Sequence, residues 1–191
     1  MDRREQLLDA ALDLFVSQGF HKSPTAAISK HAGVSTGVLF HYFETKEALI
    51  HALFLRTKLS LMTHATRALF EGKKKGVADT LRRIWEDSVE WALSYPLEFR
   101  FIEQYHHTLY MEAVHSDAAI RVREEALRSY FVDGMKAGSI QTMDPDLLIQ
   151  SGYKLITGFV EYLLERHGHV VDPKTREGAW AMFARAVLVL K

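Results

Sequence analysis

A short segment near the N-terminus carries side chains suited to contact with nucleic acid. Its pattern predicts a helix from about Ser35 to Phe43, whose length of ~13 Å suits insertion into a major groove ~12 Å wide. Leu39 and Phe43 are expected to face inward as anchors. The residues left to point outward are Thr36, Gly37, Phe40 and His41. A hydroxyl, an open backbone position, an apolar ring and an imidazole make this helix a candidate reader of base edges.

The preceding residues predict the second helix that such a reader needs. Ser23-Pro24 is a helix-start signal, and Gly33 supplies a tight turn. Ala27, Ile28 and Ala32 are small or apolar, which suits the crossing of two short helices. The segment is therefore expected to form a helix-turn-helix.

A second group of side chains is a candidate lining for a small-molecule pocket. Residues 85–110 hold seven of the chain's 21 aromatic residues, and such pockets have mostly apolar and aromatic walls. Aromatic residues at helical spacing also suit a plain core, and both interpretations stay open. The candidate lining residues are Trp91, Phe99, Ile102, Tyr105, His106, Tyr110 and Tyr130. An apolar or aromatic effector is expected.

Metal and catalytic chemistry are not expected. Without cysteine, thiolate metal sites and cysteine nucleophiles are excluded. His106 and His107 point about 100° apart on a helix, and His167-Gly168-His169 falls in a predicted loop. Residues 103–115 place no nucleophile, base and orienting group at a recognisable spacing. We therefore expect no metal, no cofactor and no enzymatic activity.

Helical periodicity covers most of the chain, and no stretch alternates with period two long enough for a strand. Capping signals mark several starts, among them Asp2 with Glu5, Asp144-Pro145 and Asp172-Pro173. About nine helices are expected, over residues 2–19, 23–33, 35–43, 45–72, 77–94, 97–111, 116–136, 144–166 and 172–190. The fold class is all-α.

Length and composition allow one domain or two small ones. The chain has 191 residues and is 48% hydrophobic, enough to bury a core. Its longest apolar run covers residues 179–184, far short of the ~20 residues of a membrane-spanning helix. No apolar signal segment follows the first residues, so a cytoplasmic protein without membrane contact is expected.

At fixed spacing the N-terminal part contains Gly19-Phe20, then Ala32-Gly33-Val34-Ser35-Thr36-Gly37-Val38-Leu39-Phe40-His41-Tyr42-Phe43, then Lys46-Glu47-Ala48-Leu49. Over about residues 3–50 the chain resembles the DNA-binding domain of the TetR family of bacterial repressors. The resemblance implies a three-helix DNA-binding domain over residues 1–46, a long linking helix over 45–71, and a helical effector-binding and dimerisation domain over 47–191.

The resemblance also implies roles for single residues. Thr36 and Gly37 correspond to positions that approach base edges, and Ser35 precedes them at the helix start. His41 and Tyr42 correspond to contacts with bases or phosphates, and Lys46 to a phosphate ligand. These positions and Phe40 form the expected DNA-binding set.

Two positions depart from the family's pattern. Phe40 stands where Tyr is usual, so one hydroxyl contact is lost, and the ring is left to touch a thymine methyl group instead. Ser29 replaces the usual Ala and is small enough to keep the helix crossing.

The expected protein is a ligand-responsive repressor that binds double-stranded operator DNA as a homodimer and is released by a small apolar or aromatic effector. The resemblance implies dimerisation through the last two helices, about 144–190. Symmetry supports a dimer, because a two-fold dimer places two recognition helices ~34 Å apart. The alternatives are a helical protein-interaction module whose helix-turn-helix does not bind DNA and, less favoured, an all-α enzyme.

The charge balance sets the kind of DNA binding to expect. Lys+Arg and Asp+Glu number 24 each, and residues 1–46 alone carry five basic and five acidic side chains. Few phosphates can be neutralised by so few cations, which predicts a shallow salt dependence and weak non-specific binding.

Overall fold

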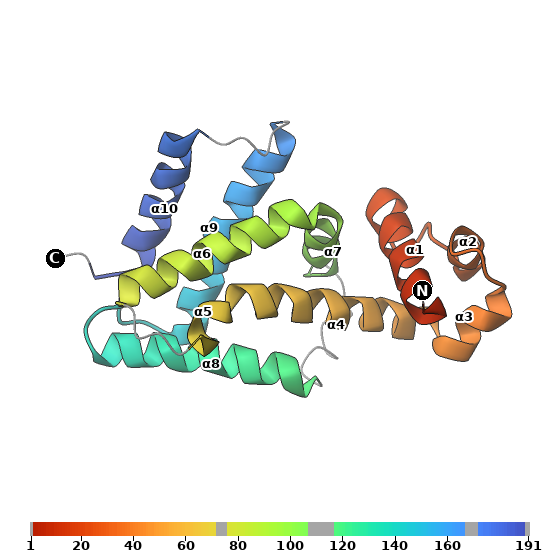
Figure 1. The fold of residues 1–191 in the computed structure, drawn as a ribbon, viewed down its shortest axis with the longest axis horizontal. Helices are drawn as coiled ribbons and strands as arrows, with labels where there is room; N and C mark the ends of the chain where they lie inside the picture. Colours follow the sequence, from red (N-terminus) through yellow and green to blue (C-terminus); the bar gives the residue numbers. More distant parts are fainter. Residues whose placement is uncertain (1, 72–75, 107–116, 167–171, 190–191) are drawn as a thin grey trace. The chain divides into compact units, whose positions relative to one another are not determined.

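The computed structural model describes residues 2–71, 76–106, 117–166 and 172–189 (Figure 1). These ranges contain ten α-helices and no β-strand, which confirms the all-α prediction. A single isolated bridge joins Ile140 to Leu188. The helices are α1 (Arg3–Gln18), α2 (Thr25–His31), α3 (Thr36–Tyr42), α4 (Lys46–Ala65), α5 (Arg67–Phe70), α6 (Val77–Ser94), α7 (Pro96–His106), α8 (Ala118–Lys136), α9 (Pro145–Glu165) and α10 (Pro173–Val187).

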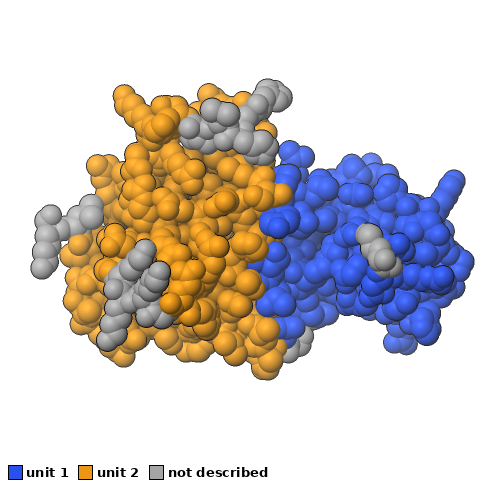
Figure 2. Space-filling model, in the orientation of Figure 1, with its two compact units in different colours: residues 1–60, 95–117 blue, residues 61–94, 118–191 orange. Residues whose placement is uncertain are grey.

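The chain divides into two compact units, coloured separately in Figure 2. Unit 1 consists of Met1–Ser60 with Tyr95–Asp117, and unit 2 of Leu61–Ser94 with Ala118–Lys191. The predicted boundary between a DNA-binding and an effector-binding domain near residue 46 stays a prediction. Unit 1 includes α7 because this helix adds aromatic side chains to the core formed by the N-terminal helices.

The core of unit 1 is built around aromatic contacts between α1, α4 and α7. The ring centroids of Phe15 and Phe101 lie 6.3 Å apart, and Phe20 lies 5.1 Å from the first and 5.8 Å from the second. Phe54 of α4 stacks on Tyr105 of α7 at 4.0 Å. These rings are buried with Leu, Ile and Ala side chains of α1–α4, so α7 is an integral part of this core.

The predicted long helix over 45–72 is interrupted at Thr66, which accounts for the tenth helix. The fully buried Thr66 hydroxyl donates to the carbonyl oxygen of Met62 at 2.6 Å and accepts from the Arg123 guanidinium at 3.1 Å. A threonine that bonds back four residues tends to bend a helix. Beyond the break, Arg67 of α5 pairs with the buried Asp87 of α6 at 2.7 Å.

Unit 2 packs α6 against α9 and α10. Trp85 of α6 stacks on Phe159 at 5.5 Å and meets Trp180 edge-on at 6.0 Å. A Cβ atom at Gly152 would lie 3.1 Å from the Phe183 ring, so a larger residue would crowd this crossing of α9 and α10. Both helices begin as predicted, at capping carboxylates followed by proline.

Candidate nucleic-acid interface

The helix-turn-helix of unit 1 is formed by α2, a tight turn and α3. At the end of α2 the Gly33 amide donates to the Lys30 carbonyl at 3.1 Å, and the Val34 amide donates to the Ser29 carbonyl at 3.0 Å. These two bonds form a Schellman motif, in which Gly33 takes a left-handed φ of 69°. Ser35 then caps α3 through a 3.3 Å bond from the Val38 amide to its hydroxyl.

The start of α2 differs in detail from the predicted one. Pro24 is the N-cap, and α2 begins at Thr25. The buried Ser23 hydroxyl does not cap the helix but donates to the carbonyl oxygens of Leu14 and Gly19, at 3.0 and 2.8 Å. Ser23 therefore fastens the α1–α2 connection to α1.

The predicted outward face of α3 is exposed. Gly37, Phe40 and His41 follow the i, i+3, i+4 spacing of one helix face, and each is exposed, while Leu39 is fully buried on the opposite side. Thr36 is partly exposed at the helix start. The exposed part of α3 thus offers the backbone at Gly37, which no side chain covers, and three side chains of different chemistry, those of Thr36, Phe40 and His41.

Tyr42 extends the candidate surface past the end of this face. It is 39% exposed, and its ring meets the His41 ring edge-on, with 5.2 Å between centroids. The structure therefore brings Ser35, Thr36, Gly37, Phe40, His41 and Tyr42 together on one seven-residue helix and its cap.

Lys46 is placed differently from the other members of the predicted set. Its ammonium donates to the backbone carbonyl of Phe20 and lies 5.9 Å from the centroid of the Phe15 ring. Burial lowers the pKa of Lys46, and the neighbouring Glu47 only partly opposes that shift. In this structure Lys46 joins the start of α4 to the α1–α2 connection.

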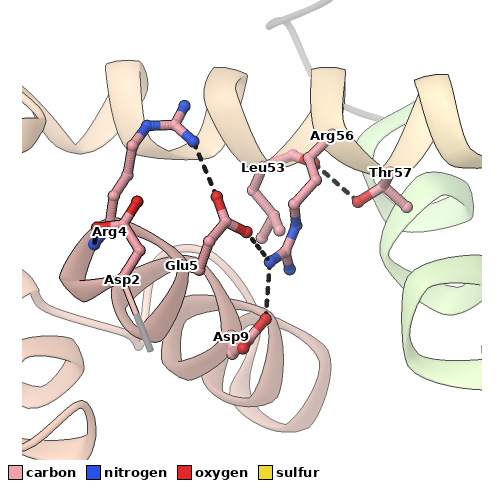
Figure 3. Close-up of polar contacts among 7 residues, drawn as sticks. All are labelled: Asp2, Arg4, Glu5, Asp9, Leu53, Arg56 and Thr57. Atoms are coloured by element: carbon pink, nitrogen blue, oxygen red, sulfur yellow. Dashed lines mark hydrogen bonds and ion pairs between the residues drawn. The ribbon is translucent and has the colours of Figure 1, made fainter.

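A charged network that the sequence did not predict connects α4 to α1 (Figure 3). One nitrogen of the Arg56 guanidinium donates to Glu5 at 3.0 Å and to Asp9 at 2.7 Å. The other carboxylate oxygen of Glu5 accepts from Arg4 at 3.1 Å. The Arg4 guanidinium lies 5.5 Å from the centroid of the Phe43 ring, which ends α3.

The sequence indicated only the acidic side chains of this network. Glu5 and Asp9 are one helical turn apart, which indicates that a cation could bind both. The partner is more than forty residues away on α4, and only the packing of α4 against α1 selects Arg56.

Four of the predicted pocket residues lie in unit 1, on α7. Phe99, Ile102 and Tyr105 are buried, and Tyr105 belongs to the unit 1 core. His106 is partly exposed, and its ring meets Phe54 edge-on at 6.3 Å. These side chains therefore contribute to the packing of the unit that contains the helix-turn-helix.

Two other members lie in unit 2. Trp91 is buried on α6. Tyr130 of α8 is partly buried and donates to the Val77 carbonyl at 3.4 Å; burial raises its pKa, and a hydrogen bond with Thr80 opposes that shift. The seventh candidate, Tyr110, lies outside the described residues.

Two findings concern other classes of site. Among the described residues, no three histidine or carboxylate side chains lie close enough together to hold a metal ion. In the same ranges, no helix has both the length and the apolar character needed to cross a bilayer.

The N-terminal segment matches a known family. Residues 7–53 match the model of the bacterial regulatory proteins of the tetR family. The HTH-type transcriptional regulator BetI of Klebsiella pneumoniae (strain 342) is 48% identical over 50 residues, which are 26% of this chain and 26% of that protein. The similarity thus spans about a quarter of the curated relative's length.

Solved structures extend the similarity to the whole fold. A TetR-family transcription regulator from Shewanella sp. PV-4 superposes with a TM-score of 0.88 at 26% identity, covering all of both chains. AibR, solved in complex with isovaleryl coenzyme A and operator DNA, superposes with a TM-score of 0.72 at 19% identity, over 95% of this chain and 97% of that one. At 19% identity the second similarity concerns the fold alone.

Proposed function

We propose that this chain, whose residues 7–53 match the tetR family and whose fold is similar to that of TetR-family regulators, is a transcriptional repressor that binds operator DNA as a homodimer and is released by a small effector. The observation that carries the proposal is the exposed face of α3, which follows a Schellman turn and is held by the packed core of unit 1. The relatives are transcriptional regulators. We therefore propose that this chain regulates transcription in the cytoplasm, where the DNA lies, and does not act as an enzyme.

The proposed DNA contacts come from α3 and its cap. The N-terminal residues of a recognition helix contact base edges in the major groove. Polar side chains and backbone amides around the helix contact phosphates. We assign base reading to the first turn and the exposed face, and phosphate contact to Tyr42. Lys46 joins this set by exchanging the Phe20 carbonyl for a phosphate when DNA is bound.

Dimerisation through α9 and α10 is supported by their exposed faces. On α9 an exposed stripe with helical spacing runs from Leu147, 54% exposed, to Tyr162, 42% exposed. A shallow hollow along it is lined by Gln150, Ser151, Lys154 and Leu155. On α10, Gly178 and Ala186 flank Met182, which is 61% exposed. Small residues beside large apolar ones allow two helices to approach closely.

The proposed effector is apolar or aromatic. Trp91 and Tyr130, the two described candidates in unit 2, support this class, since apolar walls bury apolar ligands. AibR, which has the same fold, is a precedent for a protein that holds a small molecule, isovaleryl coenzyme A, together with operator DNA. For the effector to release DNA, it must bind the DNA-free state more tightly, and DNA must weaken effector binding by the same factor.

The test begins with selection of operators from a random duplex pool by the full chain. Tyr42→Ala and Lys46→Ala are expected to weaken binding to the selected operator at least tenfold while the dimer stays intact. Leu97→Ala, on α7 and 38% exposed, is the control and keeps wild-type affinity. Enrichment of no duplex by the folded dimer would instead favour a helical protein-interaction module.

A further inference from the structure

Phe40 is an exposed apolar side chain on the recognition helix. Its side chain is 48% exposed, whereas the adjacent Leu39 is fully buried and supplies the contact of α3 with the core of unit 1. Half of the Phe40 surface is thus still in water after folding. An aromatic ring left exposed on a recognition surface is available to an apolar group on the partner.

The surroundings of Phe40 suit a close approach of that partner. Gly37 precedes it by one turn on the same face, and a Cβ atom at Gly37 would meet only the Ser35 hydroxyl, at 3.8 Å. The backbone of α3 is therefore uncovered at this point. A partner surface that rests against Gly37 comes within reach of the Phe40 ring.

The chemistry of the major groove limits what the ring can contact there. Base edges present hydrogen-bond donors and acceptors, which a phenyl ring cannot satisfy, and one apolar group, the C5-methyl of thymine. We propose that Phe40 is a specificity-determining residue that packs on the C5-methyl group of a thymine in each operator half-site. The proposal rests on the proposed function, because it requires α3 in the major groove.

Deoxyuridine provides the direct test, since it differs from thymidine only by this methyl group. Each thymine of the selected operator is replaced in turn by deoxyuridine, symmetrically in both half-sites, and affinity is measured by fluorescence anisotropy. Burial of one methyl group corresponds to about a fourfold change in affinity, so the wild-type dimer should lose about fifteenfold at one position. The other thymines should show much smaller losses.

The Phe40 variants identify the side chain that reads the methyl group. Phe40→Ala should bind the thymine and the deoxyuridine operators equally, and Phe40→Gln, which keeps the length of the side chain but not its apolar character, should do the same. Leu97→Ala is the matched control and should keep the wild-type preference. Circular dichroism and dimer mass establish that each variant is folded.

The outcomes separate this inference from the proposed function. Operator binding with no loss at any deoxyuridine, or a loss that Phe40→Ala retains, overturns the role of Phe40 and leaves the regulator intact. Selection of half-sites without thymine overturns it as well. If the folded dimer enriches no operator, the proposed function fails, and the role of Phe40 fails with it.

Discussion

Two glycines of the helix-turn-helix, Gly33 and Gly37, have different physical roles. Gly33 has a φ of 69°, a conformation that costs an L-residue about 1–2 kcal/mol, although no atom lies within 4 Å of its added Cβ. Gly37 is helical, and its missing side chain leaves the outer face of α3 open. One glycine is thus required by the turn and the other by the proposed interface.

Alanine at each position should separate stability from DNA binding. Gly33→Ala is expected to lower the free energy of unfolding by about 1–2 kcal/mol, measured by urea denaturation. Gly37→Ala should raise it by up to about 1 kcal/mol, because alanine is the better helix former, yet weaken operator binding. Equal operator affinities of wild type and Gly37→Ala would contradict the close approach of DNA to α3.

Lys46 provides a prediction with two readouts. Lys46→Met removes the hydrogen bond to the Phe20 carbonyl, so the free protein should lose about 1 kcal/mol of stability. If the ammonium moves to a phosphate in the complex, the slope of log affinity against log salt should also become shallower by about one for each lysine removed.

The same titrations give the salt dependence of operator binding by the wild-type protein. Residues 1–46 have no net charge, and two of their cations already have partners in the free protein, since Arg4 contacts Glu5 and Phe43 while Lys46 contacts Phe20. A slope of about −5 or shallower is expected, and a slope near −10 would contradict the neutral interface. An unchanged slope in Lys46→Met would mean that Lys46 stays on Phe20 in the complex.

At the scale of elements, Arg56 connects α4 to α1 through Glu5 and Asp9. These side chains are 28%, 40% and 51% exposed, so solvent screens the pairs, and their loss should cost no more than about 1–2 kcal/mol of stability. Arg56→Met should therefore fold. Because α4 carries residues of both units, we expect the variant to reduce the factor by which the proposed effector weakens operator binding.

A double-mutant cycle distinguishes this role from a general loss of stability. In a Glu5→Gln, Asp9→Asn background the Arg56→Met change should have little further effect on that factor, since its partners are already removed. Arg56→Lys, which keeps the charge, should retain most of it. A full effect of Arg56→Met in the background without the carboxylates would refute the assigned pairing.

Elements with local signals were predictable from the sequence, and those fixed by distant partners were not. Asp2, Ser35, Asp144 and Asp172 cap helices because their side chains bond to amides two or three residues away. The break at Thr66 depends in part on a partner on α8, so the periodicity of residues 45–72 indicated a single helix.

In the candidate site, too, features with local signals were predictable and those fixed by distant partners were not. Exposure of α3 follows from its own periodicity, with Leu39 marking the buried side. The Phe20 contact of Lys46 and the packing of Tyr105 into unit 1 involve residues more than twenty positions apart. Aromatic composition in residues 85–110 could not distinguish a pocket lining from a core, and α7 supplies side chains to the core of unit 1.

At the scale of the whole molecule, the proposed activity depends on two copies of the chain. Met182 lies at the centre of the exposed face of α10, and Met182→Glu would bury a charge in the proposed interface. The variant is expected to run as a monomer in size-exclusion chromatography with light scattering and to lose operator affinity. Val122→Glu on α8 changes a residue of nearly equal exposure, 60%, and should remain dimeric. A dimeric Met182→Glu would place the interface elsewhere.

The central claim is that two α3 helices of one dimer read a two-fold symmetric operator. Anisotropy titrations of the full chain on the selected operator and on a duplex holding only one half-site test it directly. Two recognition helices about 34 Å apart should bind the complete operator at least a hundredfold more tightly, with one dimer per duplex. Equal affinity for the half-site and the complete operator would contradict the claim.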